Sequence, residues 1–330
     1  MLQELRKQLE QGVGLTENQA EQALEAILSS TSSDEQIAAF LVSLSDKGET
    51  AEELAGFSRV MRRHSVHLKS DHEVCVDTAG TGGGISTFNI STAAAFVIAG
   101  AGMPVAKHGN RAITSRSGSA DVLLELGVKV DCPVTTSEKA LNQIGLCFMF
   151  APLFHPAMKR VAEIRKNLGR RTIFNMIGPL TNPASAPCQV IGVYAEDLVE
   201  RMADALRRLG CKQAWVVHGR DGIDEISISN DTRVVEVKGT EMRSFDFKPL
   251  QAKLGVPAGG TPGENAKLIK GILDGRVAGP ARDVVVINAA AALHLASGDR
   301  FSKSMEDAEA SLKSGAALEK LSQLIEAYSE

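Results

Sequence analysis

The sequence predicts an α/β protein, with a small N-terminal helical bundle and a large α/β domain whose mostly parallel central sheet is flanked by helices. Residues 1 to about 68 show only helical patterns, whereas from Glu73 onward short apolar segments alternate with helical ones. This alternation is typical of parallel sheets covered on both faces. A chain of 330 residues can hold both parts, which we place at residues 1–68 and 69–330. The segment near residues 165–180 is a candidate to join the helical domain.

Three signals for helix starts divide the N-terminal region. Each is a Ser or Thr followed three residues later by Glu or Gln, at Thr16–Gln19, Ser32–Glu35 and Thr50–Glu53. Apolar residues recur at helical spacing, as within Ile37–Leu44. These patterns predict three or four short helices, whose few reactive groups favour packing or dimerisation over chemistry.

Nine short apolar segments of the large domain are expected to be strands. They are Glu73–Val76, Pro104–Lys107, Val128–Asp131, Cys147–Phe150, Val190–Tyr194, Ala214–His218, Glu225–Ser229, Arg233–Val237 and Val284–Asn288. Helices are expected at Ala93–Gly100, Thr136–Ile144, Leu198–Leu209 and Gly263–Leu273. In such sheets, ligands bind beyond the carboxyl ends of the strands.

Composition excludes several functional classes. The net charge of −4 argues against general nucleic-acid binding. No apolar run reaches the length of a membrane span, and the N-terminus does not resemble a signal peptide. The five cysteines are scattered without a C-x-x-C pair, which fits a reducing cytoplasm and gives no support for a disulfide framework or a cysteine metal site.

The segment Val76–Thr92 joins an expected strand to an expected buried helix, and four of its residues between Gly80 and Gly84 are glycine. Glycine lets backbone N–H groups converge on one point, and a helix N-terminus adds unpaired donors, so this arrangement suits an anion. Ser91 or Thr92 is available as the N-cap of the helix. The loop matches neither common nucleotide-binding pattern. A tight turn that binds nothing is the alternative.

The segment Lys107–Asp121 also follows an expected strand. It combines Lys107, Arg111 and Arg116 with several hydroxyl side chains, which suits a phosphate ligand with more than one charge. A solvated basic loop is the alternative. The preceding glycine loop, one helix and one strand earlier, favours the phosphate site.

Two further segments carry charged side chains at expected turns. Arg165 lies near the end of a helix expected to begin around Pro156. Asp221, Asp224 and Glu225 follow an expected strand, where adjacent carboxylates suit Mg²⁺ together with phosphate oxygens. A solvated acidic turn is the alternative, but the phosphate loops favour a pyrophosphate–Mg²⁺ site.

Taken together, these segments resemble the anthranilate phosphoribosyltransferase family over nearly the full length. G-T-G-G, T-x-N-x-S-T, K-H-G-N-R, G-S-A-D, N-x-x-G-P-L-T-N-P and D-G-x-D-E occur in the family's order. The resemblance implies transfer of a 5-phosphoribosyl group from phosphoribosyl pyrophosphate to anthranilate, with Mg²⁺, as the second step of tryptophan biosynthesis from chorismate. It also implies a cytoplasmic homodimer joined through the helical domain, with the substrates meeting between the two domains.

The resemblance also implies roles for individual residues. For phosphoribosyl pyrophosphate they are Gly80, Gly83, Gly84, Thr87, Asn89, Ile90, Ser91, Thr92, Lys107, His108, Gly109, Asn110, Arg111, Ala112, Ile113, Thr114, Ser115 and Ser119. For anthranilate they are Gly80, Asn110 and Arg165, and for Mg²⁺ they are Ser91, Asp224 and Glu225. Lys107 and Arg165 would act by charge and positioning, and no general base is assigned.

Some alternatives stay open. The glycine loop is one residue shorter than the family pattern and lacks its aspartate, which leaves open one or two Mg²⁺ ions. A catalytic role for His108 or His155 is also open. A pyrimidine nucleoside phosphorylase on the same fold is disfavoured by the K-H-G-N-R and D-G-I-D-E segments. A nucleic-acid-binding relative without turnover is disfavoured by the net charge and the paired acids.

Overall fold

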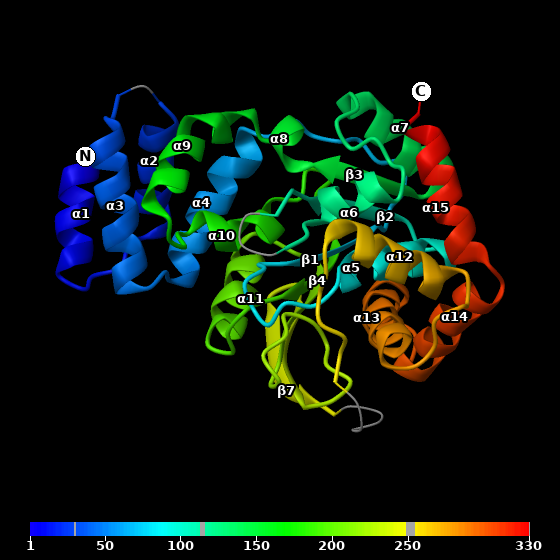
Figure 1. Cartoon of the computed structure of the whole chain (residues 1–330). Helices are drawn as coiled ribbons and strands as arrows, with labels where there is room; N and C mark the ends of the chain where they lie inside the picture. Colours follow the sequence, from blue (N-terminus) through cyan, green and yellow to red (C-terminus); the bar gives the residue numbers. More distant parts are fainter. Residues whose placement is uncertain (30, 113–115, 249–254, 330) are drawn as a thin grey trace.

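The computed structural model describes residues 1–29, 31–112, 116–248 and 255–329. Its N-terminal part is a bundle of four helices, at one end of the molecule in Figure 1. They are α1 (Leu2–Glu10), α2 (Glu17–Leu28), α3 (Asp34–Lys47) and α4 (Ala51–Arg63). Capping boxes begin α2 at Thr16 and α4 at Thr50, as predicted. The third box is shifted by one residue from the prediction, because Ser33 rather than Ser32 accepts the N–H of Gln36.

A segment from the middle of the chain packs on this bundle. It comprises η1 (Pro156–Met158), α9 (Lys159–Leu168), α10 (Phe174–Ile177) and η2 (Gly178–Thr181). Helix α9 packs against α2 and α3, and α10 and η2 pack against α4. Arg160 pairs with Asp34 at 2.6 Å, and Arg170 pairs with Asp46 at 2.5 Å. Figure 1 shows α9 and α10 beside the N-terminal helices.

One seven-stranded sheet, in the order β3-β2-β1-β4-β5-β6-β7, forms the centre of the large domain. The strands are β1 (Val76–Gly80), β2 (Val105–Gly109), β3 (Leu146–Phe150), β4 (Cys188–Gly192), β5 (Gln213–Gly219), β6 (Thr232–Lys238) and β7 (Glu241–Phe247). The first five are parallel, and β6 and β7 are antiparallel additions at one edge. The prediction of a mostly parallel sheet is confirmed.

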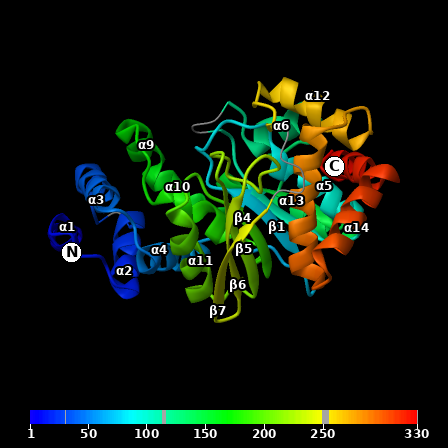
Figure 2. The ribbon, with the colours of Figure 1, turned by 90° about the horizontal axis from the view of Figure 1, so that it is seen from below.

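Helices cover both faces of the sheet, and alternate strand residues belong to two separate cores. Val190 and Val217 lie in the core under α5 (Ile90–Gly100) and α13 (Pro280–Ser297). Ile191 and Val216 lie in the second core, which α11 (Leu198–Arg208) shares with α4. Figure 2 shows the bundle and α13 on opposite sides of the strands. The remaining helices are α6 (Ser119–Glu125), α7 (Val134–Ile144), α8 (Ala151–Phe154), α12 (Pro262–Leu273), α14 (Phe301–Lys313) and α15 (Ala316–Ala327).

Three predicted strands are wrong. Val284–Asn288 lies inside α13, where burial on all sides makes a helical segment as continuously apolar as a central strand. Val128–Asp131 is a turn after α6, and Glu225–Ser229 is an irregular segment held by side-chain hydrogen bonds. Strand β7 was not predicted, because most of its residues are exposed and lack an apolar pattern.

No described helix combines the length and the apolar character that a membrane span needs.

Candidate active site

The glycine loop follows β1 at the carboxyl edge of the parallel strands. Thr81 N–H donates to Gly192 O at 2.9 Å, and Ile85 N–H donates to Gly222 O at 3.0 Å. Gly82 and Gly83 have φ values of 65° and 91°, which favour glycine. The loop is therefore fixed between the end of β4 and the turn that follows β5.

The acidic turn after β5 lies directly against this loop. Gly82 N–H donates to Asp224 Oδ2 at 3.0 Å. A Cβ atom at Gly80 would lie 2.7 Å from the same oxygen, and one at Gly84 would lie 2.7 Å from Gly222 O. The shortened loop thus has no room for a side chain at Gly84, the position nearest to the family's missing aspartate.

Helix α5 begins at Ile90 with Asn89 as its N-cap, so the prediction of Ser91 or Thr92 as N-cap is wrong. The Asn89 side chain instead donates to Ser117 O and accepts from Asn265, both at 3.0 Å. This side chain joins the helix start to the basic loop and to α12. Ser91 and Thr92 consequently lie within the first turn of the helix.

Lys107, on β2, is buried beneath this first turn. Its Nζ donates to Thr78 O at 2.6 Å and to Ser91 Oγ at 3.2 Å. Burial lowers the pKa of Lys107, and the charges of Asp77 and Glu225 oppose that shift. The negative charge of nearby Asp77 and the two hydrogen bonds to oxygen atoms favour the charged form of Lys107, although its side chain is removed from water.

Asp224 and Glu225 are half-buried neighbours that lie close to Ser91 and Lys107. Burial is the main cause that raises both pKa values, for Glu225 to about 8, with the charge of Asp224 as its second cause. The charge of Lys107 and the backbone of Ser91 partly oppose the rise in the pKa of Glu225. The carboxylates of Asp224 and Glu225 and the hydroxyl of Ser91 are hard oxygen ligands of the kind that Mg²⁺ prefers. A bound Mg²⁺ would reduce the repulsion between the two carboxylates. In contrast, Asp221 accepts from the hydroxyls of Ser227 and Ser229 and holds a turn.

The basic loop after β2 is held at its base by Asp121. The Asp121 carboxylate accepts the N–H groups of Ala112 and Gly118 at 2.8 and 3.0 Å and lies 3.6 Å from Arg111. Ser119 Oγ donates to Asn110 O at 3.3 Å. The other predicted loop residues, Ile113, Thr114 and Ser115, lie outside the described residues.

Arg165, on α9, approaches from the helical bundle. Its guanidinium lies 5.3 Å from the centre of the Phe174 ring. Within the described chain it has no carboxylate partner, and burial lowers its pKa. An arginine that is partly removed from water without a counterion is suited to bind a ligand carboxylate.

His108 and His155 form a buried ring pair with centroids 5.0 Å apart. Burial lowers the pKa of His108 to about 3 and that of His155 to about 4. Both rings are therefore neutral near pH 7, which leaves His108 and His155 available as neutral hydrogen-bonding groups rather than as cations.

Two residues near the site were not singled out from the sequence. Arg171 Nη2 donates to Gly83 O at 2.7 Å, and its guanidinium lies 4.0 Å from the centre of the Tyr194 ring. Asn182 donates to Asp77 Oδ2 at 2.7 Å, and Asp77 Oδ1 accepts from His108 N. Their partners are distant in sequence, so residue type alone gave no signal.

Two family descriptions match the two parts of the chain. Residues 3–65 match "Glycosyl transferase family, helical bundle domain", and residues 72–318 match "Glycosyl transferase family, a/b domain". Among curated relatives, an anthranilate phosphoribosyltransferase of Syntrophobacter fumaroxidans is 50% identical and covers 98% of each chain. One of Moorella thermoacetica is 49% identical over 95% of this chain and 94% of the relative.

Solved structures agree with these matches. The anthranilate phosphoribosyltransferase of Thermus thermophilus has a TM-score of 0.90 and 38% identity over 98% of this chain and 99% of the other. That of Saccharomyces cerevisiae, in complex with PRPP and Mg, has a TM-score of 0.89 and 31% identity over 99% and 98%.

Proposed function

Because the chain belongs to the anthranilate phosphoribosyltransferase family, we propose that it transfers the 5-phosphoribosyl group of phosphoribosyl pyrophosphate to the amine of anthranilate. The products are N-(5-phosphoribosyl)anthranilate and pyrophosphate, in the second step of tryptophan biosynthesis from chorismate. The main support for this proposal is that the glycine loop, Lys107 and the Asp224–Glu225 pair lie close together at one edge of the sheet. These groups suit a ligand with several phosphate charges.

We assign the donor to the glycine loop, the first turn of α5 and the basic loop. Convergent backbone N–H groups of the glycine loop and the start of α5 favour negative charge. Ser91, Asp224 and Glu225 would hold Mg²⁺, which when bound supplies positive charge to the pyrophosphate. Thr92 supports this assignment, because its Oγ1 is buried without a hydrogen bond among the described residues.

The reaction breaks the bond between C1 of the ribosyl group and the pyrophosphate oxygen and forms a bond from C1 to the anthranilate nitrogen. Negative charge grows on the leaving group, while the sugar becomes oxocarbenium-like. The ammonium of Lys107 and the loop N–H groups provide fixed positive potential beside that growing charge. The aromatic amine attacks in its neutral form and its proton passes to solvent, so the mechanism requires no general base.

Anthranilate would be oriented from the opposite side by Arg165, with Gly80 and Asn110 near the amine. A guanidinium and a carboxylate form two parallel hydrogen bonds, which fix both the position and the angle of the ring. Holding the amine near C1 supplies the proximity part of catalysis. Since Arg165 belongs to a segment packed on the bundle, the bundle and the sheet each position one substrate.

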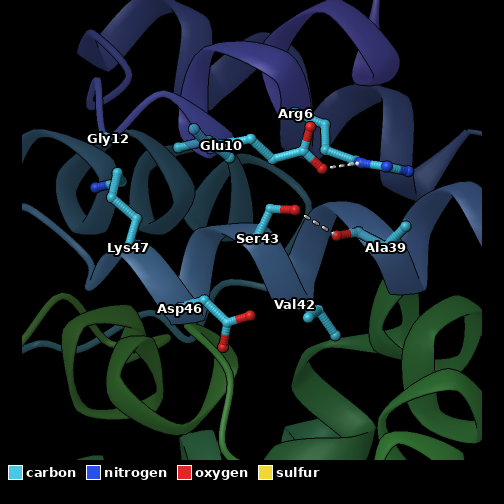
Figure 3. A pocket seen from close by; sticks show the side chains of 9 residues that line it. Arg6, Glu10, Gly12, Ala39, Val42, Ser43, Asp46 and Lys47 are labelled. Atoms are coloured by element: carbon cyan, nitrogen blue, oxygen red, sulfur yellow. Dashed lines mark hydrogen bonds and ion pairs between the residues drawn. The ribbon is translucent and has the colours of Figure 1, made fainter.

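We also propose that two copies associate through the helical domain, at a groove between α1 and α3. This groove has a volume of about 530 Å³. Figure 3 shows Arg6 and Glu10 along one wall and Val42 and Ser43 along the other. Val13, next to the groove, is 51% exposed. A second copy seated here would cover Val13 and Val42 together with the charged side chains that line the groove, while leaving the sheet edge open.

Two broader assignments accompany the reaction. We divide the chain into residues 1–68 and 69–330, with the segment near 165–180 joining the helical domain, as its packing against α2, α3 and α4 supports. We place the enzyme in the cytoplasm, because its five cysteines are free thiols and burial raises the pKa of each. Fractionation that finds the enzyme outside the cytoplasm would contradict this location.

The first prediction concerns Arg165. Loss of its charge-assisted bond in Arg165→Ala, worth about 1.5–3 kcal/mol, should raise the KM for anthranilate roughly 10- to 100-fold. The KM for phosphoribosyl pyrophosphate should change little. The measurement is the loss of anthranilate fluorescence when the ribosyl donor and Mg²⁺ are added.

Arg170→Ala is the matched control, because Arg170 is a neighbouring exposed arginine that pairs with Asp46. An unchanged KM for anthranilate in Arg165→Ala refutes the role of Arg165. No fluorescence loss with the wild-type enzyme, together with phosphorolysis of a pyrimidine nucleoside, would refute the proposed reaction.

The second prediction concerns the acidic pair. Replacing both residues with Asp224→Asn and Glu225→Gln should lower Mg²⁺-dependent turnover at least ~100-fold, because the uncharged amides bind Mg²⁺ poorly. The measurements are the rate as a function of Mg²⁺ concentration and calorimetric Mg²⁺ binding. Asp221→Asn, in the same turn, should keep the activity, and full activity of the double variant would disprove the metal assignment.

The third prediction concerns Arg171 as a positioning residue. Arg171→Ala removes the bond to Gly83 and the stacking on Tyr194, so the KM for phosphoribosyl pyrophosphate should rise roughly 5- to 50-fold. The KM for anthranilate should rise less, and added guanidinium ion should restore part of the affinity. Equal changes in both KM values, without rescue, would indicate a purely structural role.

The fourth prediction concerns self-association. The wild-type enzyme should have twice the 35.0 kDa mass of one chain by light scattering. Val42→Glu should shift it toward the monomer, because a charge would be buried in the interface. Val66→Glu, at an exposed valine after α4, is the control. A monomeric wild-type enzyme, or an unaffected Val42→Glu dimer, would exclude this interface.

A further inference from the structure

A second cavity lies where β4 and β5 begin. Its volume is about 220 Å³. The walls come from the end of α4, the turn after η2 and the turn between α11 and β5, and include Arg62, Asn182, Ser185, Gln189, Leu209 and Lys212. The glycine loop follows the carboxyl end of β1, which is parallel to β4. The cavity and the candidate active site therefore lie at opposite edges of the sheet.

Arg62 is an unpaired cation in this cavity. Its Nε donates to Leu180 O at 2.8 Å, and its terminal nitrogens make no hydrogen bond to any described residue. No described carboxylate lies within 4.0 Å of its guanidinium. Cys211, also in the wall, cannot supply the missing charge, because burial raises the pKa of its thiol to about 11.

Other half-buried arginines of this chain have carboxylate partners. Arg59 pairs with Glu17 and Glu21, and Arg282 pairs with Glu309. Among the described arginines, burial lowers the pKa only of Arg62 and Arg165. For Arg165 we have proposed a ligand carboxylate as the missing partner. Because a desolvated charge without a counterion costs free energy, the same feature at Arg62 requires an explanation.

We propose that this cavity binds a small oxyanion, held by Arg62 inside and by Lys212 at the mouth. The side chain of Gln189 donates to Pro179 O, and that of Asn182 donates to Asp77 and Ala106 O. Because these amide groups already have partners, Arg62 and Lys212 are the groups left to bind the anion. A cavity of about 220 Å³ is large enough for a phosphate or a small carboxylate with a few waters.

An anion bound in this cavity would stabilise the contact between the helical bundle and the sheet. Arg62 belongs to α4 and holds a carbonyl of η2, and the next residue after η2, Asn182, donates to Asp77 on β1. Binding should therefore stabilise the folded enzyme. This site does not depend on the transferase reaction, because none of its residues belongs to the proposed substrate contacts.

Ser185 allows a test that leaves Arg62 in place. Ser185 has a φ of 52°, a backbone conformation that Asp and Asn tolerate, and its side chain is exposed at the cavity. Ser185→Asp places a carboxylate beside the two cations and should compete with the anion. Ser185→Asn has nearly the same shape without the charge and is the matched control.

The experiment is calorimetric titration of the full-length enzyme and both variants with inorganic phosphate and, separately, with acetate, at constant ionic strength. We expect the wild type and Ser185→Asn to bind one more phosphate than Ser185→Asp, or to bind it at least roughly 10-fold more tightly. Lys212→Gln should weaken the same binding event. Acetate binding that Ser185→Asp abolishes would identify a carboxylate site, and phosphate binding alone would identify a phosphate site.

Equal binding of both anions by the wild type and Ser185→Asp would overturn the proposal. Transferase activity of Ser185→Asp and Ser185→Asn is measured in parallel and should equal that of the wild type. Normal activity with no difference in anion binding rejects the cavity site alone. If the wild-type enzyme does not decrease anthranilate fluorescence when the ribosyl donor and Mg²⁺ are added, the proposed reaction is rejected. The result for the cavity is unaffected by that outcome.

Discussion

The buried ammonium group of Lys107 holds together the edge of the sheet at which the candidate site is built. It is 3% exposed, and its bonds to Thr78 O and Ser91 Oγ join β2 to β1 and to the first turn of α5. A charge so far from water needs compensation, and the nearby charge of Asp77 is the largest influence that favours the charged form of Lys107. The positive charge that a phosphate ligand needs is therefore fixed in place before any ligand arrives.

The glycine loop depends on contacts from both parts of the protein. Asp224 holds it from the sheet, and Arg171 holds it from the segment packed on the bundle. Ser45 of α3 donates to Arg171 O at 3.2 Å, which continues the connection into the helical domain. A displacement of the bundle would therefore move both the loop to which we assign the donor and Arg165, to which we assign the acceptor. In this proposal, one short segment links the two substrate positions.

The fold class, and the segments that the structure brings together at the candidate site, could be predicted because their signals are local. Glycine runs, capping boxes and alternating apolar segments reflect the backbone within a few residues. Val284–Asn288 was mistaken for a strand because complete burial removes the periodicity that separates a helix from a strand. Asp77, Arg171 and Asn182 were assigned no role in the site, because their importance arises from partners about 30 to 105 residues away. The pairing of Asp224 with the glycine loop was anticipated only because both followed expected strands.

Satisfied and unsatisfied charges have different roles in this molecule. Glu53 is fully buried, but it accepts the N–H groups of Leu15 and Thr50 and pairs with Lys47 at 2.9 Å, so it serves the packing of the bundle. Arg165 has no carboxylate partner among the described residues, and burial raises the pKa of Glu225 to about 8; in the proposed site, anthranilate and Mg²⁺ would offset these costs. Retaining an uncompensated charge in a folded protein costs stability unless a ligand offsets that cost. The same reasoning extends to Arg62, whose unpaired guanidinium lies in a cavity at the far edge of the sheet. Incomplete pairing of buried charges thus supports the proposed binding positions independently of any sequence motif.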